Sequence, residues 1–141
     1  IHVETQGTIW QNWLVDVDYA AVSFKGPSSK NEINVDAAVE FLSKLDAGQA
    51  FYDIKLAVDI TQDVPFVKNL INKCIEKHLM YTNIYLQPVA SNAKEFETDT
   101  YLKRYKELVQ TVINDDFRYY TPRIIVLPQL HKLVWGNKEG V

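Results

Sequence analysis

Polar side chains occur where five short apolar segments of this sequence end. They are Glu4 and Thr5, Ser23 and Lys25, Lys55, Gln87, and Gln129 and His131. Carboxylate, hydroxyl, ammonium, amide and imidazole groups gathered in one place could hydrogen-bond a small polar ligand or exchange a proton with it. The sequence contains no Gly-rich phosphate loop, nucleophile elbow or zinc-ligand spacing. These residues therefore predict a ligand-binding rim without specifying its reaction.

The pattern of apolar residues predicts elements that would bring this rim together. We expect strands at residues 1–5, 19–24, 51–58, 83–89 and 122–128, with a short helix or turn at 9–16 and helices after 36, after 63 and at 99–114. Alternating strands and helices indicate an α/β fold with right-handed crossovers and a parallel sheet. If the helices cover one side only, the sheet is part of a barrel. The carboxyl ends of parallel strands then meet at one edge, where ligands bind.

Helix boundaries and buried faces can also be predicted. Asp36 and Asp63 are expected N-caps, the second followed by Pro65 in the first turn, and Gly48 is expected to stop the first helix. The buried side of the long third helix is predicted to consist of Leu102, Tyr105, Leu108, Val109, Val112 and Ile113. Cys74 occupies an apolar helical position and is therefore expected in the core. The side chains of His2 and His78 are expected to face solvent. The aromatic residues Phe117, Tyr119 and Tyr120 are expected to form a packed connection between elements.

Each rim candidate also has a structural interpretation. Glu4 and Lys55 could form an ion pair inside a barrel, because buried charges are usually paired. Ser23 could cap a turn while Lys25 lies in solvent. Gln87 lies in an apolar strand, where a buried amide requires hydrogen-bond partners. Gln129 and His131 could be an ordinary surface pair.

Composition narrows the class of protein. The 141 residues fit a single domain, 1–141, with 47% hydrophobic and 23% charged residues. A net charge of -3 does not favour a nucleic-acid or membrane partner, and no apolar run approaches the ~18 residues that span a bilayer. The single cysteine, Cys74, excludes an internal disulfide and favours a cytoplasmic location. Ile1 is not an initiator Met, which we interpret as an incomplete copy of a larger gene product.

Four segments, in this order, resemble the C-terminal half of 7-carboxy-7-deazaguanine synthases, a family of radical S-adenosylmethionine enzymes. They are ETQGT (residues 4–8), VSFKGPSS (22–29), LQPV (86–89) and PQLHKLVWGNKEGV (128–141). The first resembles the family's ETxGT strand end, the second its SPKxPSS segment and the third its LQP strand end. The fourth resembles the closing segment of the longer members. The resemblance extends over nearly the whole chain.

The resemblance implies the C-terminal half of a partial (βα)6-type barrel. It implies a lyase that uses S-adenosylmethionine, a [4Fe-4S] cluster on a CxxxCxxC loop and Mg2+. The 5′-deoxyadenosyl radical takes hydrogen from 6-carboxy-5,6,7,8-tetrahydropterin, which becomes 7-carboxy-7-deazaguanine with loss of ammonia. The product feeds the biosynthesis of queuosine and other 7-deazapurines. A homodimer is implied as well.

The resemblance also assigns roles to residues. Those matching the two S-adenosylmethionine segments are Ser23, Phe24, Lys25, Gln87, Pro88, Val89 and Ala90. Gln129 and His131 match tail residues near the pterin. Glu4, Thr5 and Lys55 would lie on the same rim. No metal ligand is assigned to this chain.

The sequence departs from the family in three ways. One cysteine cannot supply CxxxCxxC, the GGEP-type segment that precedes the first strand in the family does not occur, and Phe24 replaces the usual proline. We therefore expect the chain to require a missing N-terminal half as its partner and to be inactive by itself. The alternative is a truncated, non-catalytic homologue that acts as a ligand-binding or partner-binding module.

Overall fold

The computed structural model describes residues 1–90, 96–114 and 123–138. Its sheet has five strands: β1 (His2–Thr5), β2 (Tyr19–Phe24), β3 (Phe51–Val58), β4 (Ile84–Pro88) and β5 (Ile124–Val126). Every neighbouring pair is parallel, and the strands lie in chain order, β1-β2-β3-β4-β5. The α/β class and the parallel sheet predicted from the sequence are confirmed.

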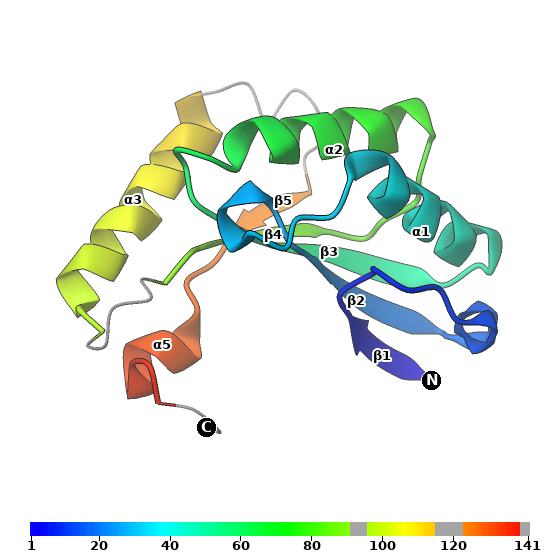
Figure 1. Ribbon diagram of the computed structural model, residues 1–141, viewed down its shortest axis with the longest axis horizontal. Helices are drawn as coiled ribbons and strands as arrows, with labels where there is room; N and C mark the ends of the chain where they lie inside the picture. The colour runs from blue at the N-terminus through cyan, green and yellow to red at the C-terminus, as the bar shows by residue number, and fades with distance from the viewer. Residues whose placement is uncertain (91–95, 115–122, 139–141) are drawn as a thin grey trace.

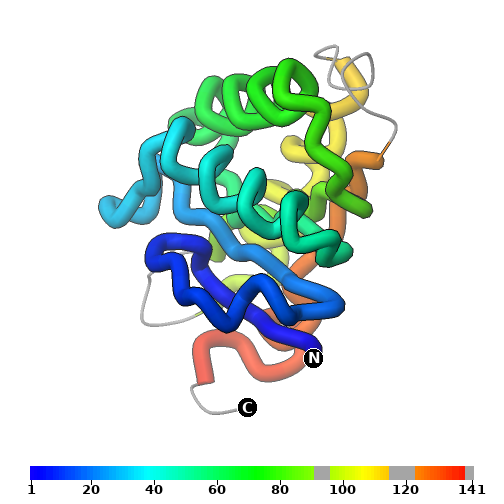
Figure 2. The backbone as a smooth tube through the Cα atoms, turned by 90° about the vertical axis from the view of Figure 1, so that its right-hand side faces the viewer, coloured from blue at the N-terminus to red at the C-terminus, as the bar shows by residue number. Residues whose placement is uncertain are grey.

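The helices that connect these strands are α1 (Val35–Ala47), α2 (Val64–Glu76) and α3 (Thr98–Asn114). Because every crossover steps in the same direction, right-handed connections place them on one face of the sheet. Figure 1 shows α1, α2 and α3 together on that face, and Figure 2 shows the same layer from the side. The other face is not covered by these helices. This is the arrangement of a partial βα barrel, as predicted.

Shorter helical segments complete the described chain. They are the 3-10 turns η1 (Asn12–Asp16) and η2 (Pro27–Ser29), and the helix α5 (Leu130–Trp135) in the tail, where the sequence showed no strong period. In Figures 1 and 2, α5 lies on the side of the sheet opposite α1 and α2. No helix among the described residues is both long enough and apolar enough to cross a membrane.

The core lies between the sheet and the helices. Alternate strand residues point into it, because side chains of a strand alternate between faces. These are Ala20, Val22 and Phe24 of β2, Tyr52, Ile54, Leu56 and Val58 of β3, and Ile84 and Leu86 of β4. The helices contribute Leu42, Leu45, Leu70, Ile71 and Leu108, and Cys74 is fully buried with them, as expected. His2 and His78 are exposed, also as expected.

One of the two predicted N-caps is wrong, and the other is right in position but makes no capping hydrogen bond. The N-cap of α1 is Asn34, whose side-chain oxygen accepts hydrogen bonds from the backbone of Asp36 and Ala37, so Asp36 lies inside the helix. Asp63 occupies the N-cap position of α2 but makes no capping hydrogen bond, because its carboxylate binds two loops instead. Gly48 does end α1, as predicted.

The buried side of α3 also differs from the prediction. Leu108 and Val112 are buried as expected, but Leu102 is 43% and Ile113 51% exposed, and Tyr101 is buried in their place. Figure 1 shows α3 at the end of the helix layer. Leu102 and Ile113 therefore lie at the surface of α3 and not in the core. Phe117, Tyr119, Tyr120 and the start of the fifth predicted strand lie outside the described residues.

Candidate functional site

The strand register brings the predicted rim residues to one edge and one face of the sheet. Ser23 pairs with Lys55, and Gln87 pairs with Ala57, two residues further toward the carboxyl edge. Each alternates with residues of the helix-facing core, so each points to the open face. Ser23 and Gln87 therefore lie toward the same end of the sheet. The sequence analysis predicted this juxtaposition.

Glu4 joins this group through an ion pair with Lys55. Lys55 Nζ lies 3.2 Å from Glu4 Oε1 and donates a hydrogen bond to it. β2 separates the two strands, and its small residue Ala21 lies beside Glu4 in the register. The pair was proposed as the structural alternative; it forms, but on the open face, with side chains 37% and 69% exposed. At that exposure it contributes at most about 1 kcal/mol to stability, and both groups remain accessible to a ligand.

A second polar group lines the open face near the amino ends of the strands. The Tyr19 hydroxyl donates a hydrogen bond to Asp53, whose other carboxylate oxygen accepts from the Asn83 backbone at 3.0 Å and its side chain at 3.3 Å. Asp53 is 7% exposed. Burial, and then the adjacent carboxylate, raise the pKa of Tyr19 to about 12. Sequence reasoning missed this group; its signal was an acidic residue in the middle of the apolar strand FYDIKLAV.

Lys25 and Gln87 carry the polar groups that best fit a ligand at the carboxyl edge. Both are partly buried, and neither side chain makes a hydrogen bond or ion pair with the described part of the chain. Partly buried polar groups gain most from a partner, because burial without one is costly. Their ammonium and amide groups can therefore bind acceptors and donors of a ligand.

Phe24, which precedes Lys25 in the VSFK segment, points toward the opposite face of the sheet. Phe24 is 1% exposed and packs in the helix-facing core, so only its backbone can reach a ligand. Gly7 of the ETQGT turn lies against this ring: with φ at 67°, a Cβ there would come within 2.5 Å of Phe24 Cε1. The turn after β1 thus requires glycine, both for its conformation and for space. Thr5 supports the turn, since its hydroxyl accepts the Gly7 N–H at 3.2 Å.

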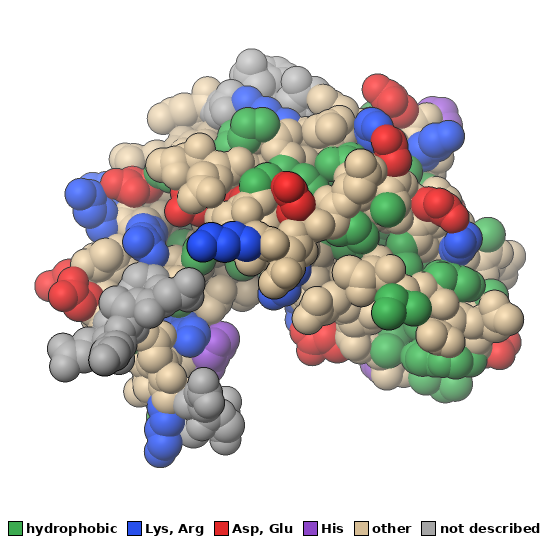
Figure 3. All heavy atoms as spheres, in the orientation of Figure 1, with side chains coloured by type: hydrophobic (Ala, Val, Ile, Leu, Met, Phe, Trp, Pro, Cys, Tyr) green, Lys and Arg blue, Asp and Glu red, His purple; other side chains and the backbone are tan. Residues whose placement is uncertain are grey.

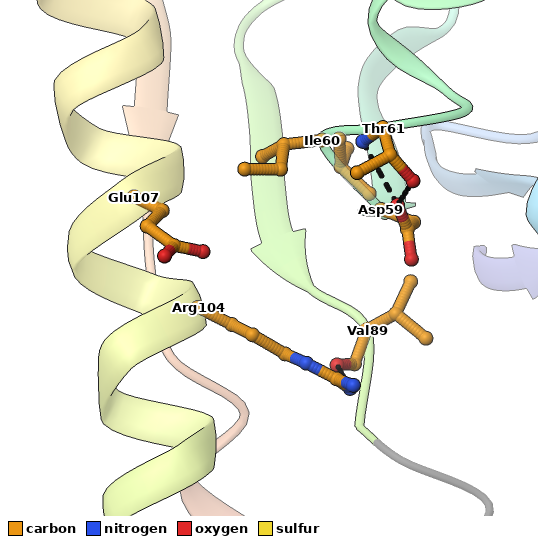
Figure 4. A pocket seen from close by; sticks show the side chains of 7 residues that line it. Asp59, Ile60, Thr61, Val89, Arg104 and Glu107 are labelled. Carbon is orange, nitrogen blue, oxygen red and sulfur yellow. Dashed lines mark hydrogen bonds between the residues drawn. The ribbon is translucent and has the colours of Figure 1, made fainter.

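A cavity of about 190 Å³ opens at the carboxyl ends of β3 and β4, beside α3 (Figure 4). It is lined by Val58, Asp59, Ile60, Thr61, Val89, Arg104 and Glu107. Figure 4 shows Arg104 extending from α3 to Val89, whose carbonyl accepts its hydrogen bond at 3.1 Å. Val89 was assigned to the cofactor site from the sequence. Its neighbours on the chain also lie near this edge: Pro88 is buried and Ala90 partly buried.

The charges of this cavity come from residues that sequence reasoning missed. Asp59 accepts hydrogen bonds from the Thr61 hydroxyl and, at 2.9 Å, the Thr61 backbone. The Thr61 hydroxyl is the main reason for the lowered pKa of Asp59, and the positive charge of Arg104 contributes. Glu107 extends toward the same space one turn along α3 (Figure 4). One cation and two carboxylates can together bind a ligand group that carries both charges. The sequence signal was the DIT turn immediately after β3.

The structure separates the two residues assigned to the pterin. Gln129 lies against the end of β4: its backbone N–H donates to the Tyr101 hydroxyl at 2.6 Å, and its side chain donates to the Pro88 carbonyl at 3.4 Å. His131 is exposed on α5. Figure 3 shows the surface hollowed between the tail segment at the lower left and the β1 side at the lower right. Gln129 thus joins the strand-end group, whereas His131 belongs to the tail.

Comparison with known proteins supports the predicted resemblance. No protein-family profile matches the chain. A 7-carboxy-7-deazaguanine synthase of Bacillus cereus is 32% identical over 149 residues, and one of Bacillus subtilis is 33% identical over 147 residues. Each match covers 99% of this chain and 56% of the relative, so the chain spans about half the length of these curated proteins.

One further match is of another kind. Ribonuclease VapC1 of Aquifex aeolicus is 34% identical over 87 residues, which is 61% of this chain and 54% of that protein. It extends over much less of the chain than the other two.

The two synthase matches confirm the resemblance predicted from the four segments. Along nearly its whole length this chain is similar to 7-carboxy-7-deazaguanine synthases, as is consistent with the C-terminal half of such a protein.

Proposed function

We propose that this chain forms the C-terminal half of a carbon–nitrogen lyase of the 7-carboxy-7-deazaguanine synthase type. The complete enzyme would act on 6-carboxy-5,6,7,8-tetrahydropterin and release ammonia in queuosine and 7-deazapurine biosynthesis. The supporting observation is the set of polar side chains on the open face of a partial barrel, in a chain similar to these synthases over 99% of its length. When bound, S-adenosylmethionine would supply the radical that takes hydrogen from the pterin.

The residues of this chain would bind and orient the two ligands. Lys25 offers an ammonium to a carboxylate, and Gln87 offers an amide to ligand donors and acceptors. Ser23 lies beside Lys55 in the register, and β3, which carries Lys55, separates it from the strand of Gln87. Gln129, fixed beside Pro88, would orient the pterin side of the pocket. The partners of the chain in this proposal are the two ligands, the N-terminal half and, as in the resemblance, a second copy.

The donor set of this chain does not fit an iron–sulfur cluster. Cys74 is fully buried, and burial raises the pKa of its thiol to about 12, whereas cluster ligands are thiolates. Within the described residues, no three His, Cys, Asp or Glu side chains converge on one point as metal ligands would. We therefore assign the cluster and Mg2+ to the other half of the enzyme and derive no step through them here.

Titration of S-adenosylmethionine tests the proposal. In the complete enzyme, Lys25→Ala and Gln87→Ala should each weaken binding by about 1–3 kcal/mol, since each removes a polar contact from a largely buried ligand. That is roughly tenfold or more in dissociation constant. Lys44→Ala and Gln110→Ala, which alter exposed residues on α1 and α3, are the matched controls. Unchanged affinity in both rim variants would contradict the cofactor assignment.

The pterin assignment is tested by His131→Ala. The exposed side chain lies in the tail, so its loss should leave the affinity for S-adenosylmethionine nearly unchanged and raise the pterin concentration needed for half-maximal turnover. Titrating each ligand separately distinguishes this result from the Lys25 and Gln87 effects. A His131 variant that loses S-adenosylmethionine affinity but uses pterin normally would reverse the assignment.

The single cysteine supports a second candidate function, a non-catalytic homologue that binds a ligand or a partner. The DNA upstream of Ile1 distinguishes the two. A continuous reading frame with a CxxxCxxC segment supports the lyase, whereas a start codon directly before Ile1 supports the binding module.

A further inference from the structure

Asp63 is a buried charged residue that the binding roles above do not use. It is 1% exposed. One carboxylate oxygen accepts the Ser28 backbone N–H at 2.8 Å, and the other accepts the Ser28 hydroxyl at 2.6 Å and the Asp59 backbone N–H at 2.7 Å. Ser28 belongs to the loop after β2, and Asp59 to the loop after β3. A single carboxylate therefore connects two loops at the carboxyl edge of the sheet.

The position of Asp63 in the sequence makes this use of its side chain unexpected. It directly precedes α2, where an aspartate ordinarily caps the helix. Asn34 does so for α1, but Asp63 makes no capping hydrogen bond. Burying a carboxylate is costly unless its hydrogen bonds are made, and here all three come from the two loops. The hydrogen bonds of the Asp63 carboxylate therefore stabilise the positions of these two loops and not the start of the helix.

Gly26 shows how closely the first loop is packed on this carboxylate. A Cβ at Gly26 would lie 2.8 Å from Asp63 Oδ1. Gly26 follows Lys25 directly, and the Ser29 N–H and hydroxyl both bond to the Gly26 carbonyl, at 3.1 and 2.7 Å. The contact thus sets the path of the chain next to Lys25. Asp59 begins the DIT turn that lines the cavity beside Val89 and Arg104.

We infer that Asp63 is a positioning residue: its carboxylate holds the loop of Lys25 and the Asp59 turn in the relative placement that S-adenosylmethionine binding requires. This inference rests on the proposed function. Asp63 does not contact the ligand. It acts through the backbone of Ser28 and Asp59, so that Lys25 is held in place before the ligand binds. Binding then does not have to offset the entropic cost of ordering this loop.

The test compares Asp63→Asn with the unmodified complete enzyme. Asn keeps the size of the side chain but replaces one acceptor oxygen with a donor, which opposes the N–H groups of Ser28 or Asp59. Hydrogen exchange at these two amides should become faster. The dissociation constant of S-adenosylmethionine should rise about tenfold, and turnover at saturating S-adenosylmethionine should be largely retained. Glu76→Gln, an exposed carboxylate at the other end of α2, is the control and should change none of these.

Gly26→Ala provides a second variant in case Asp63→Asn folds poorly. It leaves every hydrogen-bonding side chain in place and introduces a methyl group against the carboxylate, so it should show the same pattern. Faster exchange with unchanged affinity in either folded variant would overturn the inference and leave the proposed function intact. If the unmodified complete enzyme binds no S-adenosylmethionine, the proposed function itself fails, and exchange at Ser28 and Asp59 still shows whether Asp63 orders the loops.

Discussion

At the scale of single residues, the open face of the sheet combines exposed and buried charges that behave differently. Glu4 and Lys55 are accessible and weakly coupled, whereas Asp53 is buried and held by Tyr19 and Asn83. A buried carboxylate with three hydrogen bonds is fixed in position, because losing any partner would leave it unsatisfied. The hydrogen-bonded group of Tyr19, Asp53 and Asn83 at the amino ends of the strands is therefore rigid. The side chains that can rearrange around a ligand lie toward the carboxyl edge of the sheet.

The ionisation of Tyr19 tests whether its hydroxyl is buried beside the Asp53 carboxylate. Its pKa is raised to about 12 by burial and by the Asp53 carboxylate, compared with about 10 for an unfolded tyrosine. Folding therefore favours the neutral phenol, so its contribution to stability is complete below about pH 10 and is lost as the pH rises through about 12. Tyrosinate absorbance, as the difference between the protein and its Tyr19→Phe variant, should show ionisation near pH 12.

Asp53→Asn separates the two causes of that shift. Removing the negative charge should lower the pKa of Tyr19 while burial still keeps it above 10. The same difference titration in the Asp53→Asn background measures this. Ionisation of Tyr19 at its ordinary pKa in the unmodified protein would show that the hydroxyl is not buried beside a carboxylate.

At the scale of elements, the first two helices begin in contrasting ways. Asn34 satisfies the free N–H groups of α1 at Asp36 and Ala37, at 2.8 and 3.4 Å. The side chain at the start of α2 instead serves the loops at the carboxyl edge. The first start stabilises a helix locally, and the second fixes the tertiary arrangement around the site.

The α1 cap predicts a measurable loss of stability. Asn34→Ala should lower the free energy of unfolding by about 1 kcal/mol, since the two backbone N–H groups lose their acceptor. Urea unfolding followed by circular dichroism gives this value. Asn31→Ala, at an exposed position outside the helix, should change it by much less. Equal effects of the two substitutions would mean that the cap adds nothing to stability.

At the scale of the whole molecule, the described sheet is open and has the arrangement of a partial βα barrel. It ends at β1 and β5, and no helix of the main layer covers its open face (Figure 1). The relatives are nearly twice as long as the matched region. An N-terminal half that continued the sheet beyond β1 would pair this edge strand, whose backbone groups otherwise remain open for pairing with other chains.

Iron binding tests the proposed division between the halves. After anaerobic reconstitution with iron and sulfide, this chain alone should bind no cluster, because Cys74 is its single cysteine and is fully buried. Iron analysis and visible absorbance measure this directly. The complete enzyme, treated in parallel, should take up the cluster. Stoichiometric iron on the monomeric chain would contradict the division.

The order of elements and much of the rim could be predicted from the sequence because both depend on local patterns. Apolar alternation indicated the strands, helical spacing indicated α1 and α2, and chain order placed Ser23, Lys55 and Gln87 at one edge. The roles of these side chains as ligand contacts stay predictions. The four family segments were recognisable because they are contiguous in the chain.

Only the tertiary structure revealed what depends on residues far apart in the chain. From the sequence Asp63 is predicted to cap a helix, because capping is a local preference. In the fold its carboxylate binds Ser28, 35 residues away, because the folded loops bring three donors to it. Arg104 reaches Val89 only when α3 packs beside β4. The exposure of Leu102 likewise follows from the place of α3 at the end of the layer. Periodicity marks an apolar face, but which neighbours cover that face is decided by the assembled fold.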